Sequence, residues 1–229
     1  MKIAVLFSVL FFLSSSCIAP QMELKKVEPA LAKLIEGLFE QEGVDPAVGI
    51  YDSGPDFHSL AAISFVISDN GLRLFMLVNQ EKFKLLDQDE QVAVILHEIG
   101  HIKSNPYLGF VYCVAPLIMG ITAGTYAMNS INAPSWNDFP KKVILSCAIG
   151  FSAKKLAEIC CAWLSRREEL AADAFAFLKQ KKVDVFISLL EKRKQLFEKE
   201  YPDSFWARLF EDHPCAQERI AQLTGLDNQ

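Results

Sequence analysis

The sequence predicts an α+β protein that is predominantly helical and carries a small antiparallel sheet. Apolar residues recur at helical spacing in several long segments, whereas three short β-rich runs lie together in the first third of the chain. With 229 residues, 51% of them hydrophobic, the chain is long enough for one domain with a buried core. The net charge of -5 and the lack of a clustered Lys/Arg stripe argue against nucleic acid as a partner.

Residues 1–20 have the pattern of a signal peptide or an N-terminal anchor. Lys2 precedes an apolar stretch, residues 3–13, which is about half as long as the ~20 residues of a spanning helix. We therefore expect export to the cell envelope. Ser16-Cys17 also permits lipidation of Cys17 after cleavage, and an uncleaved anchor is the third interpretation.

A helix and then a sheet are expected before residue 80. The helix covers residues 23–41 and ends at Gly43 and Pro46. Three extended runs follow, residues 48–51, 61–68 and 72–78. Asn70-Gly71 stands between the last two runs and is a strong hairpin signal, so the sheet is expected to be antiparallel.

The next helix has its own start signal. Asp87 and Glu90 are three residues apart, so each side chain can accept a hydrogen bond from the other residue's backbone N–H. The helix is expected to run to about Lys103 and to end at Asn105-Pro106.

Residues 104–164 form a hydrophobic helical insertion in the predicted domain, residues 21–229. Residues 104–137 contain no Asp, Glu, Lys or Arg, and residues 107–128 are long enough to cross a bilayer. Residues 143–164 are also apolar but contain three charges, which make a crossing costly. A membrane-dipping or spanning hairpin and a soluble hydrophobic lid both fit this pattern. Helices over residues 165–180, 184–200 and 213–225 complete the chain.

The chemistry is concentrated in the sequence His97-Glu98-Ile99-Gly100-His101. Two His side chains four residues apart project from one helical face and can hold one cation at about 2.0 to 2.1 Å. Glu98 beside them is suited to take a proton from a metal-activated water and to deliver it to a leaving amine. The alternative is a pair of exposed His on an ordinary helix.

A catalytic zinc needs a third protein ligand, and the helix from residue 165 offers two carboxylates. Glu169 and Asp173 are four residues apart on one face, so one can bind metal while the other accepts a hydrogen bond from a ligand imidazole. The alternative is a solvated acidic stripe paired with Arg166 and Arg167.

Together with His213-Pro214 and Glu218-Arg219-Ile220, these segments make the chain resemble the gluzincin metallopeptidases of the CAAX prenyl protease, HtpX and Oma type. The resemblance runs from about Pro29 to Leu223 and implies a zincin-like catalytic domain. It also implies residue roles: His97, His101 and Glu169 as zinc ligands, Glu98 as catalytic acid and base, and Asp173 as support. The strand over residues 72–78 would be the edge strand that pairs with an extended substrate backbone. HtpX-type proteins carry two spanning helices before the motif, so the closer resemblance is to smaller exported members.

His213 has two roles open to it in such a site. It can donate to the developing oxyanion, or it can occupy the open metal position and hold the enzyme inactive. Alternatively it only caps the last helix beside Pro214. Arg219 is expected either in an ion pair near the site or in a structural surface pair, and His58 has no assigned role.

The sequence therefore predicts a metalloendopeptidase with one Zn²⁺ per chain. Its expected partners are polypeptide substrates, misfolded or membrane-associated proteins of the cell envelope, with membrane contact. Two rival hypotheses are a catalytically silent zinc-bound chaperone or assembly factor and an integral-membrane protease.

Overall fold

A computed structural model describes most of the chain beyond its N-terminal segment. The described residues are 25–45, 48–68, 71–104, 108–132, 135, 138–197, 210–211 and 213–227. The predicted signal peptide or anchor, residues 1–20, lies outside them, and so do Cys17 and the predicted turn residue Asn70.

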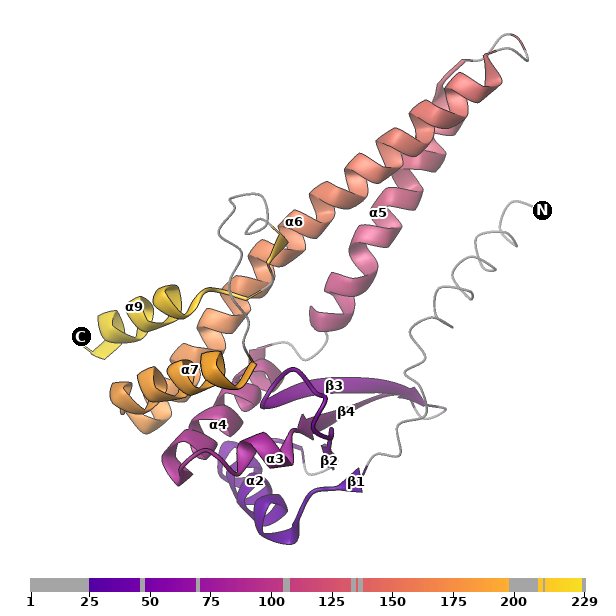
Figure 1. Ribbon diagram of the computed structural model, residues 1–229. Helices are drawn as coiled ribbons and strands as arrows, with labels where there is room; N and C mark the ends of the chain where they lie inside the picture. Colours follow the sequence, from indigo (N-terminus) through magenta and orange to yellow (C-terminus); the bar gives the residue numbers. More distant parts are fainter. Residues whose placement is uncertain are drawn as a thin grey trace.

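The fold is a helical body with a small sheet and one long projecting arm (Figure 1). The predicted class, predominantly helical α+β, is confirmed. Among the described residues, the helices of the body are α2 (Pro29–Glu42), α3 (Gln80–Phe83), α4 (Gln88–Ser104), α7 (Val183–Phe197) and α9 (Ala216–Asp227). The arm is an antiparallel pair formed by α5 (Leu108–Ser130) and the N-terminal part of α6 (Phe139–Gln180).

The sheet is mixed, which corrects the prediction of an antiparallel sheet. Its strands are β1 (Lys25–Lys26), β2 (Gly49–Asp52), β3 (Ala61–Ser68) and β4 (Gly71–Val78), in the order β1-β2-β4-β3. The chain reverses direction after β2, where Gly54 has a φ of 77°, and reverses again after β3. Hence β4 is antiparallel to β3 but parallel to β2. The edge strand beside α4 is β3, not the strand over residues 72–78 that we expected to pair with substrate.

Helix α4 lies in the core of the body and begins as its sequence predicts. The backbone N–H of Asp87 donates to Glu90 Oε2 and that of Glu90 donates to Asp87 Oδ1, each at 2.9 Å. Ile95 and Ile99 are fully buried in a cluster that also contains side chains of α2, α7 and the sheet. A helix surrounded in this way is a rigid support for the residues it carries.

Helix α6 is one continuous element of 42 residues, although the sequence predicted two segments, 143–164 and 165–180. It packs against α5 through glycines: a Cβ on Gly150 would lie 2.8 Å from the carbonyl oxygen of Gly120 and 3.2 Å from Gly124 Cα.

The last helix also differs from the prediction of residues 213–225. It begins at Ala216 and continues through Gly225.

The arm exposes many large apolar side chains. Examples from both helices have exposed fractions of 46% to 73%: Val111, Ile118, Met119, Tyr126, Ile144, Leu145, Phe151 and Leu156. Within the described ranges, no helix combines the length and the apolar composition needed to cross a membrane.

Candidate metal centre

The two imidazoles of the motif lie at the interface between α4 and α6. His97 is almost fully buried and His101 is partly exposed one turn further along α4. Between them, Gly100 allows the close approach of α6, since a Cβ there would stand 2.9 Å from Ala172 Cα. This contact brings the α6 carboxylates within reach of the α4 imidazoles.

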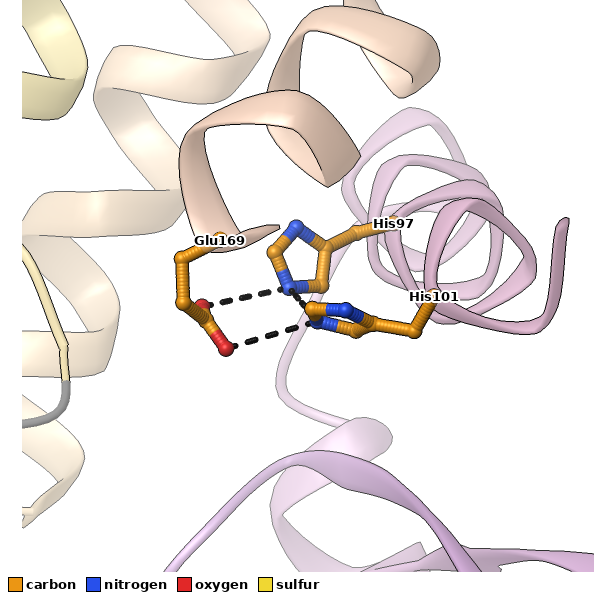
Figure 2. Close-up of side chains that lie close together, drawn as sticks. All are labelled: His97, His101 and Glu169. Carbon is orange, nitrogen blue, oxygen red and sulfur yellow. Dashed lines mark hydrogen bonds and ion pairs between the residues drawn. The ribbon is translucent and has the colours of Figure 1, made fainter. Parts of the chain in front are cut away.

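Glu169 of α6 completes a cluster of three potential metal ligands (Figure 2). Its Oε2 lies 3.4 Å from His97 Nε2, and its Oε1 lies 3.3 Å from His101 Nε2. The two Nε2 atoms are 3.1 Å apart. One donor atom from each residue therefore falls within 4.8 Å of the others.

The cluster fits a zinc ion by its chemistry and by its spacing. Two imidazoles and one carboxylate are the donor types of catalytic zinc sites, which keep the fourth position open. Ligands held at 2.0 to 2.1 Å in tetrahedral geometry are about 3.3 to 3.4 Å apart, close to the separations seen here. Glu169 Oε2 is also buried and makes no hydrogen bond in the described structure, as expected for an atom whose partner is an ion.

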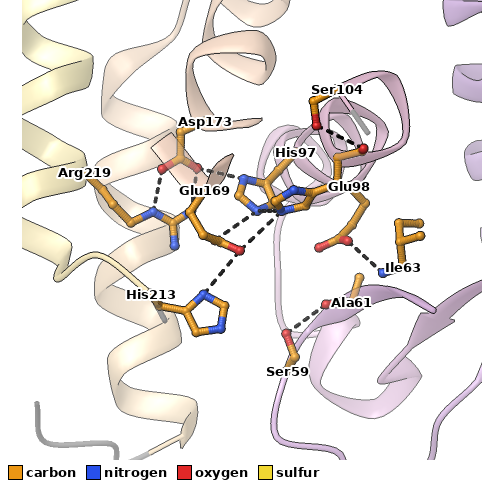
Figure 3. A network of polar contacts seen from close by, with 11 residues as sticks. Ser59, Ala61, Ile63, His97, Glu98, Ser104, Glu169, Asp173, His213 and Arg219 are labelled. Atoms are coloured by element: carbon orange, nitrogen blue, oxygen red, sulfur yellow. Dashed lines mark hydrogen bonds and ion pairs between the residues drawn. The ribbon is translucent and has the colours of Figure 1, made fainter. Parts of the chain in front are cut away.

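Asp173 orients His97 from the side away from the cluster (Figure 3). Its Oδ1 is 2.8 Å from His97 Nδ1, so Nδ1 carries a proton and Nε2 is the nitrogen that faces Glu169 and His101. Arg219 of α9 donates to both carboxylate oxygens of Asp173. Of the two alternatives for Arg219, the structure has the ion pair at the site, and this pair is buried.

The charges of these groups depend on one another. Burial opposes ionisation of His97, but hydrogen bonds to Asp173 and Glu169 outweigh it and raise the pKa of His97 to about 9. Burial also opposes the anionic form of Asp173, whose pKa Arg219 and His97 lower to about 2. The pKa of Glu169 is lowered well below its usual value because three imidazoles outweigh its burial. Both carboxylates are therefore anionic at neutral pH.

Glu98 faces the sheet and not the three potential ligands. Its Oε2 accepts a hydrogen bond of 3.0 Å from the backbone N–H of Ile63 in the edge strand β3 (Figure 3). On the same strand, the carbonyl of Ala61 accepts a hydrogen bond from Ser59 Oγ at 2.8 Å. Among the described strands β3 has a neighbour on one side only, and Glu98 links its other edge to the helix that carries His97 and His101.

A cavity of about 330 Å³ joins these groups. Its lining includes Glu98, the three potential ligands, β3 and His213. His213 Nδ1 lies 3.3 Å from Glu169 Oε1, so the structure brings this residue to the cluster as well. The cavity lining does not include His58, to which the sequence assigned no role.

A family model described as peptidase family M48 matches residues 65–227, which include the motif helix, α6 and α9. The chain belongs to peptidase family M48. It is accordingly a metallopeptidase, a hydrolase of a zinc-dependent family, with a zincin-like fold as the sequence resemblance implied.

Relatives and a solved structure agree with this membership. The chain is 25% identical to protease HtpX of Acinetobacter baumannii (strain AYE), over 92% of this chain and 75% of that protein. It is also 25% identical to protease HtpX of Xanthomonas oryzae pv. oryzae (strain MAFF 311018), over 80% of this chain and 66% of that protein. The crystal structure of S. mikatae Ste24p shares the fold, with a TM-score of 0.65 and 19% identity. That match covers 97% of this M48 chain but only 57% of Ste24p.

Other side chains that line the cavity were not anticipated from the sequence. They include Tyr112 of α5, whose pKa is raised by burial and then by Glu168, and Arg193 of α7. Their sequence context is an apolar segment and an ordinary amphipathic helix, so only the packing of α5 and α7 beside the motif could reveal them.

Proposed function

We propose that the chain is a zinc-dependent endopeptidase that binds one Zn²⁺ per chain and cleaves misfolded or membrane-associated proteins of the cell envelope. The observation that carries this proposal is the convergence of His97, His101 and Glu169, with Glu98 hydrogen-bonded to the edge strand β3. Zinc held by those three residues supplies Lewis acidity and lowers the pKa of a bound water to about 7.

The substrate backbone adds to the sheet at the edge of β3. Ala61 and Ile63 have backbone groups that bond side chains, Ser59 and Glu98, in place of a neighbouring strand. An extended peptide can take over these groups by β-augmentation, which places its carbonyl carbon between β3 and the cluster. Release from the Ile63 N–H frees Glu98 to accept a proton from the attacking water and pass it to the leaving amine.

Asp173 and Arg219 act on this chemistry through His97. The Asp173 carboxylate keeps the His97 proton on Nδ1, and Arg219 keeps Asp173 anionic and in place. His213 reaches the same cavity and supplies a donor for the negative charge that develops on the carbonyl oxygen.

The test of the catalytic assignment is Glu98→Gln. We expect the variant to keep one zinc per chain, measured by elemental analysis, and to lose casein hydrolysis by about 10² to 10⁴-fold, because proton transfer is removed without a ligand being lost. Glu36→Gln, at an exposed position on α2, is the matched control and should hydrolyse casein at the wild-type rate. Wild-type activity in Glu98→Gln would contradict the role given to Glu98.

Zinc ligation is tested separately with Glu169→Ala. The loss of one of three protein ligands should lower both zinc content and hydrolysis. A Glu169→Ala protein that binds one zinc as tightly as the wild type would contradict the ligand set.

One contact favours the catalytically silent alternative. His213 lies 3.3 Å from Glu169 and can therefore approach the fourth zinc position. In a zinc-bound chaperone or assembly factor this residue blocks water permanently, and His213→Ala then creates activity that the wild type lacks. In the endopeptidase, the same substitution lowers the rate of an active enzyme.

Membrane contact through the arm belongs to the same proposal. Ile144, Phe151 and Leu156 have exposed fractions of 70%, 61% and 61%, so the arm presents apolar surface that a lipid bilayer can cover. The triple substitution of these residues by Ser should reduce flotation of the protein with lipid vesicles. Leu85→Ser, at a residue that is 62% exposed in the body, is the control that should float like the wild type. Carbonate extraction separates this surface contact from the integral-membrane alternative.

A further inference from the structure

One face of α7 turns toward the catalytic cavity and ends in a charged residue that the proposed mechanism does not use. Its cavity-lining members follow the helical spacing i, i+3, i+4 and i+7: Phe186, Leu189, Leu190 and Arg193. The three apolar side chains are at most 8% exposed. Arg193, one turn further along, is half-buried. This wall is therefore apolar at one end and cationic at the other.

The rotation of α7 about its axis is set by a buried carboxylate of α4. Ser188 Oγ donates to Glu90 Oε1 at 2.7 Å, and Lys192 Nζ lies 2.6 Å from Glu90 Oε2. Glu90 has no exposed surface and is itself fixed in the cap of α4. With Ser188 and Lys192 held against α4, the next residue, Arg193, is directed to the cavity.

Arg193 has no ion-pair partner among the residues that the structure describes, although Glu98 and Glu168 also line the cavity. Arg219, the other guanidinium of the cavity, is held in its ion pair with Asp173. Arg193 makes no ion pair or hydrogen bond in the described structure. A guanidinium keeps its charge at every accessible pH and offers a planar fork of N–H donors that matches a carboxylate. A half-buried guanidinium in the same cavity as the proposed peptide-binding edge is suited to bind an anionic group of the substrate.

We propose that Arg193 is a specificity residue that binds a carboxylate of the polypeptide substrate. The proposal rests on the proposed peptidase function and names the substrate feature that the site selects. The substrate carboxylate can come from two sources: an Asp or Glu side chain near the scissile bond, or the C-terminus of the chain being cut. The neighbouring apolar wall of Phe186 and Leu189 accommodates an adjacent apolar side chain of the same substrate.

The experiment compares matched fluorescent peptides in the full protein. One set has a common neutral sequence with a single Glu or Gln at successive positions, and a second set has a free or amidated C-terminus. The ratio of kcat/KM for each pair is measured in the wild type and in Arg193→Gln. Binding of the same pairs to the Glu98→Gln protein is measured by fluorescence anisotropy, which requires no hydrolysis. Lys194→Gln is the control, because it removes the same charge from the neighbouring, exposed position on α7.

We expect the wild type and Lys194→Gln to prefer one carboxylate-bearing peptide about tenfold, and Arg193→Gln to reduce that ratio to about one. A tenfold preference is at the low end of what a hydrogen bond to a charged group contributes, because Arg193 is only half-buried. Loss of the Glu preference identifies the side chain as the source, and loss of the free C-terminus preference identifies the chain end. Equal ratios in wild type and Arg193→Gln overturn the proposal. If no peptide is hydrolysed but binding of the carboxylate-bearing peptides still depends on Arg193, the peptidase function is rejected and the carboxylate site is retained.

Discussion

Helices α4 and α6 approach each other closely at Gly100, inside the motif, and this makes Gly100→Ala the sharpest test of the metal centre. A Cβ on Gly100 would lie 2.9 Å from Ala172 Cα and 3.3 Å from the Ala172 carbonyl oxygen. Both of these atoms are backbone, so no side-chain rotation can relieve the clash. Ordinary contact begins at 3.4 Å, so the two helices must separate by about 0.5 Å.

The separation acts directly on the ligands. Gly100 lies between His97 and His101, and Ala172 is one turn from Glu169. Zinc sites accept deviations of about 0.2 Å in ligand distance, so a shift of about 0.5 Å is larger than the site tolerates. We expect zinc affinity to fall by about 10- to 100-fold, as it does when the supports of metal ligands are disturbed. Hydrolysis at limiting zinc should fall in parallel.

The effect on stability is smaller because two terms oppose each other. Alanine in place of glycine stabilises a helix interior by about 0.8 to 1 kcal/mol, whereas overpacking costs about 1 to 3 kcal/mol. Gly100→Ala should therefore lower the free energy of unfolding by about 0 to 2 kcal/mol. Gly37→Ala is the matched control, since nothing lies within 4 Å of its added Cβ on α2. That variant should gain about 0.5 to 1 kcal/mol and bind zinc like the wild type.

Zinc affinity is measured by competition with a chromophoric chelator, and unfolding is measured by urea titration in EDTA so that metal does not contribute. The reasoning is refuted if Gly100→Ala behaves like Gly37→Ala, with gained stability and wild-type zinc affinity. That result would mean that the α4–α6 contact does not set the ligand positions.

Two further predictions concern carboxylates that join helices of the body, the partly buried Glu42 and the fully buried Glu90. Lys179 and then Lys103 lower the pKa of Glu42 against the opposing effect of burial, so the stability from this cluster is present above about pH 4.5 and disappears as the pH falls through the lower native pKa. Because both lysines are more than one third exposed, Glu42→Gln should cost only about 0.5 to 1 kcal/mol at pH 7, and urea unfolding at pH 7 and pH 3 should show the difference only at pH 7. Glu90→Gln should cost about 1.5 to 3 kcal/mol, since it weakens the α4 cap and removes the counterion of Lys192. In a double-mutant cycle Lys192→Met should recover part of that loss, and strict additivity would contradict the pairing.

The elements predicted best are those whose signals are local. Asp87 and Glu90 cap α4 as their three-residue spacing implied, because a reciprocal cap is decided within one turn of chain. The strands near residues 61–68 and 72–78 were also found, since alternation and turn residues act over short distances. The order of the strands in the sheet was not predicted, because it depends on how the loop after β2 redirects the chain.

The spacing of the residues predicted which of them share a face at the candidate site, but the separate roles of Glu169 and Asp173 were implied only by the family resemblance. The four-residue spacing of Glu169 and Asp173 placed both on one face of α6, but left open which one meets the imidazole Nε2 atoms. The structure separates them: Glu169 faces Nε2 of both His97 and His101, whereas Asp173 faces Nδ1 of His97. This distinction arises from the offset between α4 and α6, a tertiary property. The same holds for Arg193, whose direction depends on Glu90 in another helix.

The length of α6 also answers a topological difficulty in the sequence. In the sequence, about sixty largely apolar residues separate the motif from Glu169, the third potential ligand, yet the two must meet on one side of any membrane. The structure resolves this with an antiparallel arm: α5 leads away from the body, and the single helix α6 returns to it. Two glycine contacts hold this helix, Gly150 against α5 in the arm and Gly100 of α4 against Ala172 at the site. Because one unbroken helix links both contacts, Glu169 reaches the α4 imidazoles whether the arm is covered by lipid or by water.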